Sequence, residues 1–340
     1  MNPFELRRVG NTRLKIPVLG LGTAPLSGMS LIDGLYGGTN IDIATSIINH
    51  AYDLGINFFD TAPLYGTGKA EYRLSLSKLP TVNRNSFVLS TKVGRIIIPD
   101  TYDRSENFED LNNLTAINSW TEKDVMKSFE QSLVRLELDK IDILYVHDPD
   151  MEEYGEEQAI KEAFPTLIKL KDQGLVSAIG CGMNQWEMAY KFVEMFNLDV
   201  ILLAGRYTLL DHSAYYKFLP LCKKNNVSIV IGGPYNSGIL AKDLSKTVTF
   251  DYEIAPSNLV NKAKLLSAIC LKHSVNMKSA ALQFVLAHPA IASVIPGVES
   301  ISELEENLDM IKTDIPSSLW DELKNEMLIP EDAPVPNYPV

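Results

Sequence analysis

Residues 57–66 read Asn-Phe-Phe-Asp-Thr-Ala-Pro-Leu-Tyr-Gly, an apolar run that ends in Asp60 and is followed five residues later by Tyr65. The pattern returns twice: residues 87–92 end in Lys92, and residues 141–147 end in His147. In a barrel of parallel strands the carboxyl ends meet on one face, and that face carries the chemistry. The runs therefore predict that an acid, a phenol, an amine and an imidazole meet there, a set suited to proton transfer.

Apolar runs alternate with amphipathic segments along nearly the whole chain. Most runs are rich in Val, Ile, Leu and Phe without two-residue alternation, as expected of strands buried on both faces. We expect strands at 18–23, 57–61, 87–92, 141–146, 176–181, 199–204, 227–232 and 291–295. We expect helices at 41–54, 69–78, 122–137, 157–173, 185–196, 213–225, 258–273 and 278–287. This alternation predicts an α/β fold, a closed (β/α)8 TIM barrel.

The pattern predicts a single domain over residues 1–340. A β-hairpin at 4–16 precedes the barrel at 18–328 and is placed to close its bottom, and the proline-rich tail at 329–340 is expected to be irregular. Two long connections, 94–120 and 234–257, follow strands and so belong to the active face. Loops of this length usually serve as lids or binding loops.

Composition excludes several classes of function. The 340 residues are 46% hydrophobic, enough for a sizeable core, and carry a net charge of -12. An acidic chain is a poor ligand for nucleic acid or anionic membrane, and no apolar run approaches the roughly 20 residues that span a bilayer. Three scattered cysteines form neither a disulfide framework nor a metal pattern. We expect a cytoplasmic protein with no metal site.

The four polar groups have complementary chemistry. A free tyrosine has a pKa near 10, and an ammonium group beside it favours the phenolate. We therefore expect Lys92 to lower the pKa of Tyr65, and Asp60 to hold Lys92 charged and in place. His147 would orient a carbonyl or hydroxyl group by hydrogen bonding. A tyrosine tuned in this way serves as a general acid or base.

Three motifs now point to one family. They are Gly-Ile-Asn-Phe-Phe-Asp-Thr-Ala-Pro-Leu-Tyr-Gly at 55–66, the segment 132–147 ending in His147, and Val-Ile-Pro-Gly at 294–297 followed by Glu306-Asn307. The chain resembles the aldo-keto reductases over roughly residues 4–328. This resemblance implies a (β/α)8 barrel, a nicotinamide cofactor, and a catalytic tetrad of Asp60, Tyr65, Lys92 and His147.

The resemblance also implies a set of cofactor-binding residues along the barrel mouth: Gly22, Thr23, Asp60, Asn184, Gly232, Gly233, Pro234, Ser237, Gly238, Ile295, Gly297, Glu303, Glu306 and Asn307. Many relatives stack a tyrosine on the nicotinamide where this chain has Gly232, and Tyr235 or Tyr207 are alternatives. NADPH-dependent relatives often carry Lys or Arg after Ile-Pro. Because Glu299 and Glu303 stand there instead, we expect NAD to be preferred over NADP.

Within the family, the segments 146–150, 182–187, 203–211 and 232–238 resemble the aldose 1-dehydrogenase branch. This implies oxidation of the anomeric C1 hydroxyl of an aldose such as L-fucose, L-galactose or D-arabinose to a lactone. The alternatives are a pyridoxal 4-dehydrogenase, a general aldehyde or ketone reductase, and a cofactor-binding regulatory subunit. Partners are limited to a small-molecule substrate and, at most, a small homo-oligomer.

Substrate contacts are expected from Tyr65, His147, Trp120 and Tyr36. Aromatic faces pack against the C–H groups of a sugar ring, which is the reason for including Trp120 and Tyr36. Both aromatic residues have an alternative interpretation as anchors of their loops.

Overall fold

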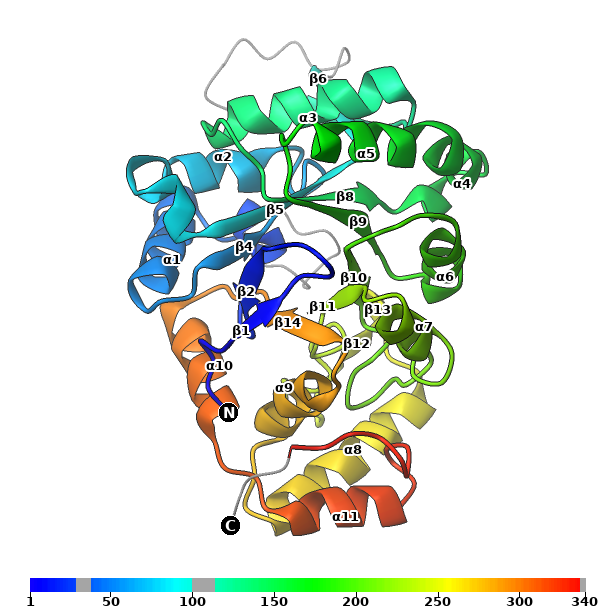
Figure 1. Cartoon of the computed structure of the whole chain (residues 1–340). Helices are drawn as coiled ribbons and strands as arrows, with labels where there is room; N and C mark the ends of the chain where they lie inside the picture. Colours follow the sequence, from blue (N-terminus) through cyan, green and yellow to red (C-terminus); the bar gives the residue numbers. More distant parts are fainter. Residues whose placement is uncertain (29–37, 100–113, 337–340) are drawn as a thin grey trace.

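The computed structural model describes residues 1–28, 38–99 and 114–336, and eight parallel strands occupy its centre (Figure 1). They are β3 (Leu21–Gly22), β4 (Phe58–Asp60), β5 (Val88–Val93), β8 (Ile143–His147), β9 (Ala178–Met183), β10 (Val200–Ala204), β11 (Ser228–Gly232) and β14 (Ile291–Ile295). Each strand pairs with the next in chain order from β3 to β14. The predicted strands are confirmed, although the first is regular only over two residues.

The two outer strands of this sheet meet and close the barrel. Leu19 bridges Val294 and Gly22 bridges Gly297, both in parallel orientation, and the Gly20 amide donates to the Val294 carbonyl at 2.9 Å. A Cβ on Gly22 would lie 2.8 Å from the carbonyl oxygen of Ile295. The close approach of β3 to β14 therefore requires glycine at this position.

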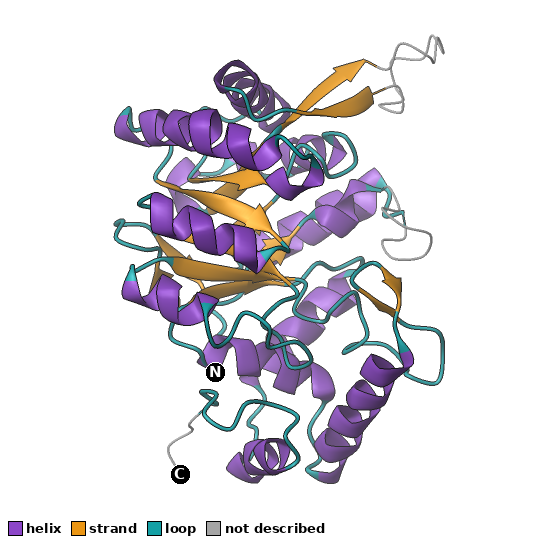
Figure 2. Ribbon diagram, turned by 90° about the vertical axis from the view of Figure 1, so that its right-hand side faces the viewer, coloured by secondary structure: helices purple, strands orange, loops and turns teal. Residues whose placement is uncertain are grey.

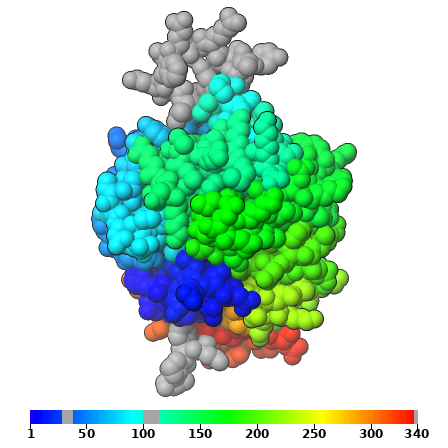
Figure 3. Space-filling view, turned by 45° about the horizontal axis from the view of Figure 1, so that its top comes forward, coloured from blue at the N-terminus to red at the C-terminus, as the bar shows by residue number. Residues whose placement is uncertain are grey.

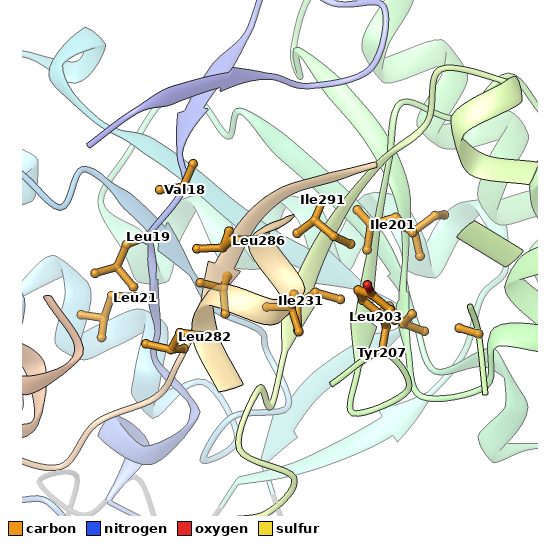
Figure 4. Close-up of a cluster of buried hydrophobic side chains, with 14 of the residues drawn as sticks. Val18, Leu19, Leu21, Ile201, Leu203, Tyr207, Ile231, Leu282, Leu286 and Ile291 are labelled. Carbon is orange, nitrogen blue, oxygen red and sulfur yellow. The ribbon is translucent and has the colours of Figure 1, made fainter. Parts of the chain in front are cut away.

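Helices surround the sheet and bury its outer face. They are α1 (Ile41–Asp53), α2 (Lys69–Ser75), α3 (Glu122–Leu136), α4 (Gly155–Gln158), α5 (Phe164–Asp172), α6 (Trp186–Met195), α7 (Phe218–Lys224), α8 (Ser257–Lys272), α9 (Met277–Ala287), α10 (Ile301–Lys312) and α11 (Ser317–Asn325). Figure 4 shows part of this outer core, where Leu282 and Leu286 of α9 lie among Leu19, Ile231 and Ile291. None of the helices in the described ranges could cross a membrane.

Three helical segments differ from the sequence-based expectation, the first being the helix expected at 69–78, which ends at Ser75. The segment 157–173 contains a π-helical stretch, Ala159–Ala163, between α4 and α5. The helix expected at 213–225 begins only at Phe218, because the preceding residues form turns in which the Ser213 amide donates to the Asp211 carboxylate at 2.8 Å. Aspartate readily makes this local bond in competition with helix.

The expected N-terminal hairpin is present and closes the bottom of the barrel. Strand β1 (Leu6–Arg8) pairs antiparallel with β2 (Lys15–Pro17), and the pair lies across the barrel in Figure 1. Val9 and Ile16 are fully buried in one cluster with the barrel residues Phe58, Ile143 and Tyr145. In the space-filling view the blue N-terminal segment fills the surface between the green segment and the red C-terminal segment (Figure 3).

The two long connections carry strands that the sequence did not indicate. Strands β6 (Arg95–Pro99) and β7 (Leu114–Asn118) pair antiparallel, and this ribbon projects from the barrel in Figure 2. Within 234–257, β12 (Thr249–Phe250) and β13 (Glu253–Ile254) form a two-residue hairpin. The tail has no regular structure over residues 329–336, although Ile329 and Ala333 are buried against the core.

Candidate active site

Asp60 and Lys92 form a buried ion pair at the ends of neighbouring strands. The Lys92 Nζ donates to Asp60 Oδ2 at 2.8 Å and to the Thr61 carbonyl at 2.7 Å, and Ser90 Oγ donates to Asp60 Oδ1 at 2.7 Å. Both charged side chains are 1% exposed. Burial raises the pKa of Asp60, and Lys92 opposes that rise. The pair satisfies both charges and fixes the amine in the floor of the site.

Tyr65 and His147 lie directly beside this pair. The Lys92 Nζ lies 4.6 Å from the centre of the Tyr65 ring. The rings of Tyr65 and His147 meet edge to face with centroids 6.1 Å apart. The four side chains that the sequence placed at the ends of three strands therefore do meet, and their catalytic roles remain predictions.

The pKa of Tyr65 moves opposite to the sequence-based expectation. It lies well above the usual value of 10, first because the phenol is buried and then because Asp60, Tyr252 and Asp148 disfavour the phenolate. The expectation that Lys92 lowers this pKa is wrong for this structure, since Lys92 faces the ring and its charge is balanced by Asp60. The phenol is therefore protonated at neutral pH and can donate a proton.

His147 is a neutral imidazole held by its backbone. Burial, together with Lys92 and Arg95, keeps its pKa well below 6.5. The His147 carbonyl accepts from Trp120 Nε1 at 3.0 Å and from Arg95 Nη1 at 3.3 Å. Nδ1 is a buried ring atom without a partner among the described residues. A neutral imidazole can hydrogen-bond an uncharged substrate oxygen.

Trp120 occupies a different position from the one expected of a substrate-binding residue. Its side chain is 0% exposed, and the indole packs so closely on Gly94 that a Cβ there would lie 2.2 Å from Nε1. Gly94 also has a φ of +108°, which favours glycine. Trp120 therefore supports His147 from behind, in agreement with the alternative interpretation as an anchor. Tyr36 lies outside the described residues.

A cavity of about 240 Å³ opens beside the ends of β11 and β14. Eight of the residues expected to bind the cofactor line it: Gly233, Pro234, Ser237, Gly238, Gly297, Glu303, Glu306 and Asn307. Two lysines, Lys242 and Lys278, share the lining and were not foreseen. Lys278 pairs with Glu306 at 2.7 Å. The Glu303 carboxylate accepts from the Glu299 amide at 2.8 Å, just before α10, whose N-cap is Ser300.

The other expected cofactor residues lie at the same end of the barrel but outside that lining. Gly22, Gly232 and Ile295 end β3, β11 and β14. The hydroxyl of Thr23 donates to the Asp60 carbonyl at 2.9 Å, so it supports the Asp60 backbone. Asn184 follows β9, and its side chain hydrogen-bonds the phenol of Tyr252.

The two tyrosines named as alternative stacking partners lie in different places. Tyr207 is 0% exposed and stacks on Tyr215 in the core, with ring centroids 5.9 Å apart. Tyr235 lines the cavity, and its hydroxyl donates to Asn307 Oδ1 at 2.6 Å.

Tyr252 is a site residue that sequence reasoning missed. It lies in the turn of the β12–β13 hairpin with a φ of +67°, after Asp251 with a φ of +52°. Such a turn normally selects Asn-Gly, so the sequence carried no hairpin signal. The hairpin is tied down by the Tyr252 amide to Ser237 Oγ at 3.1 Å and by Arg206 to Asp251 at 2.7 Å. Tyr252 thus hydrogen-bonds Asn184 and contributes to the raised pKa of Tyr65.

No group of three or more His, Cys, Asp or Glu within residues 1–28, 38–99 and 114–336 could hold a metal ion. The three cysteines are buried and unpaired with one another.

The barrel thus brings a buried ion pair, a phenol and an imidazole together near the ends of β4, β5 and β8, an arrangement suited to proton transfer. The chain belongs to the aldo/keto reductase family, whose pattern matches residues 18–325. Members of this family are oxidoreductases that use nicotinamide cofactors.

Relatives are similar over nearly the whole chain. The D-threo-aldose 1-dehydrogenase of a Pseudomonas species is 36% identical over 93% of this chain and 96% of its own. The pyridoxal 4-dehydrogenase of Microbacterium luteolum is 34% identical over 96% and 98%. Among solved structures, the holo form of an aldo-keto reductase from Bacillus halodurans superposes with a TM-score of 0.74 over 98% of both chains, at 23% identity.

Proposed function

We propose that this protein oxidises the anomeric C1 hydroxyl of an aldose of the L-fucose, L-galactose or D-arabinose type to a lactone, with NAD as the hydride acceptor. The observation that carries the proposal is the contact of Tyr65 with Lys92 and His147 above the buried Asp60. The 36% identity to a D-threo-aldose 1-dehydrogenase supports the substrate class.

Each side chain of the site has a separate task in this proposal. His147, neutral and held through its carbonyl, orients the reacting oxygen by a hydrogen bond. Tyr65 exchanges a proton with that oxygen: its phenol donates when a carbonyl is reduced, and its phenolate accepts when a hydroxyl is oxidised. Lys92 fixes the ring of Tyr65 from below, and Asp60 holds Lys92. The nicotinamide cofactor, when bound, supplies the hydride chemistry.

A substrate screen tests the proposal. Purified protein is assayed for NADH formation with L-fucose, L-galactose, D-arabinose and pyridoxal, and for NADH consumption with butanal. We expect the sugars to give the highest kcat/KM. Rapid reduction of butanal without oxidation of any sugar would instead mark a general carbonyl reductase.

Pyridoxal is the second candidate substrate. The relative named pyridoxal 4-dehydrogenase is 34% identical and covers 96% of this chain, slightly more than the aldose enzyme does. Pyridoxal also forms a cyclic hemiacetal, so the same transfer of a hydride and a proton would apply. If kcat/KM were higher for pyridoxal than for every sugar, pyridoxal would be the substrate.

We expect NAD to give a kcat/KM at least tenfold above that of NADP. The cavity is lined by three carboxylates (Glu299, Glu303, Glu306) against two lysines (Lys242, Lys278). An extra phosphate of about two negative charges would be repelled there. Glu303→Gln keeps an oxygen for the Glu299 amide but removes the charge, so it should raise kcat/KM with NADP several-fold and leave that with NAD unchanged. A higher constant with NADP in the unmodified protein would reverse the assignment.

Oxidation should accelerate as the pH rises, whereas reduction should not. Because the pKa of Tyr65 lies well above 10, the phenolate is a small fraction at pH 8 and grows about tenfold per pH unit below that pKa. Log kcat/KM for sugar oxidation should therefore rise with a slope near one between pH 8 and pH 10. Reduction uses the phenol, which stays protonated over the same range. A flat oxidation profile would remove the Tyr65 phenolate from the base role.

A further inference from the structure

Asp148 is an acidic residue of the site that the mechanism above does not use. It follows His147 at the end of β8 and has a left-handed backbone, with a φ of +37° and a ψ of 60°. Aspartate tolerates this conformation better than most residues, yet it remains uncommon outside glycine. The Asp148 amide donates to the Gly182 carbonyl at the end of β9, at 3.1 Å. The turn directs the carboxylate back to His147, whose Nε2 lies 3.3 Å from Asp148 Oδ2.

The carboxylate of Asp148 retains unused capacity to accept hydrogen bonds. Its side chain is 26% exposed, and His147 is its one polar side-chain contact among the described residues. The neighbouring cations are engaged elsewhere: Lys92 binds Asp60 and the Thr61 carbonyl, and Arg95 donates to the carbonyls of Gly94 and His147. A carboxylate offers about four acceptor positions. Because the side chain is partly exposed, those left over are open to a ligand.

Asp148 adjoins His147, the side chain that orients the reacting oxygen in the proposed function. It contributes to the raised pKa values of both Tyr65 and Tyr252, so its charge acts on both phenols. Burial raises its own pKa to about 7, although Arg95 and Lys92 oppose the rise. A substrate oxygen held by Tyr65 and His147 would place the neighbouring carbon and its substituent beside Asp148.

We propose that Asp148 accepts a hydrogen bond from the hydroxyl group on the carbon next to the reacting carbon, and so selects vicinal polyhydroxylated substrates over simple aldehydes. This inference rests on the proposed function and specifies how the sugar is recognised. A hydrogen bond to a charged acceptor discriminates by roughly 10- to 100-fold against a ligand that lacks the donor.

A chemical double-mutant cycle tests this contact. The sugar pair is D-arabinose and its 2-deoxy analogue, 2-deoxy-D-erythro-pentose, which lacks only the C2 hydroxyl. The protein pair is the unmodified enzyme and Asp148→Gly, chosen because glycine accepts the left-handed backbone and leaves the turn intact. The unmodified enzyme should prefer D-arabinose by roughly 10- to 100-fold in kcat/KM. In Asp148→Gly the preference should shrink to within about threefold, because both changes remove the same interaction.

Butanal reduction provides the reference, since butanal has no hydroxyl to bind. A change in its rate in Asp148→Gly measures the indirect effect through His147 and Tyr65, which both sugars share and which cancels in their ratio. Asp148→Asn, which keeps an acceptor oxygen without the charge, should fall between the two proteins. Equal losses on both sugars in Asp148→Gly would overturn the inference, and so would an unmodified enzyme that oxidises both sugars equally well. In either case sugar oxidation itself would stand. Reduction of butanal with no sugar oxidation would instead end both the inference and the proposed function.

Discussion

Tyr65→Phe is expected to lower kcat by roughly 100- to 10,000-fold, the usual contribution of a positioned general acid or base. The substitution removes one oxygen and keeps the ring that packs over Lys92 and against His147. The free energy of unfolding should change by less than about 1 kcal/mol, because no core volume is lost. The loss should appear in kcat, measured with the best sugar of the screen at saturating NAD.

Two controls separate this result from a general loss of structure. Tyr65→Phe should still bind NADH, as measured by the quenching of tryptophan fluorescence. Tyr216→Phe removes the hydroxyl group of a tyrosine that is 67% exposed. The turnover of this variant should match that of the unmodified protein. If Tyr65→Phe kept near-normal turnover, the proton would have to travel through another group, and Tyr252 would be the next to test.

The barrel and the meeting of the four polar groups could be predicted because the signals are local. Continuous apolar runs indicate strands buried on both faces, and three of the eight runs lead into Asp60, Lys92 and His147. Parallel strand order then brings Asp60, Lys92 and His147 to one end without knowledge of any contact. Eight expected cofactor residues also converge on one cavity, for the same reason.

The features of the site that could not be predicted from the sequence depend on contacts between distant segments. The direction of the Tyr65 pKa follows from burial and from Lys92 being neutralised by Asp60, neither of which a motif reveals. Trp120 looks like a loop aromatic, but its position under His147 depends on Gly94. Tyr252 reaches the site through a turn with no glycine. Asp148 adjoins His147 in the sequence, yet only its turn shows that its carboxylate faces inward.

Lys92→Met is expected to have the largest effect on stability. Methionine fills nearly the same volume, but it leaves the carboxylate of Asp60 buried with Ser90 as its one side-chain donor within the described part of the chain. Removing one partner of a buried ion pair costs about 3–5 kcal/mol. Urea unfolding of Lys92→Met should show this loss, and turnover should collapse because the support below the Tyr65 ring is gone.

The double variant Asp60→Asn with Lys92→Met separates the structural role of the pair from its role in the reaction. The double variant has no unpaired buried charge, so most of the lost free energy of unfolding should be regained. Replacing a whole buried ion pair costs far less than removing one of its partners. Turnover should stay low, since Tyr65 and His147 would still lack the amine beside them. Lys161→Met breaks the exposed pair with Glu157 and should leave unfolding unchanged. If the double variant regained both stability and turnover, Lys92 would serve only the fold. If it regained stability alone, the charge of Lys92 would be needed for the chemistry of Tyr65.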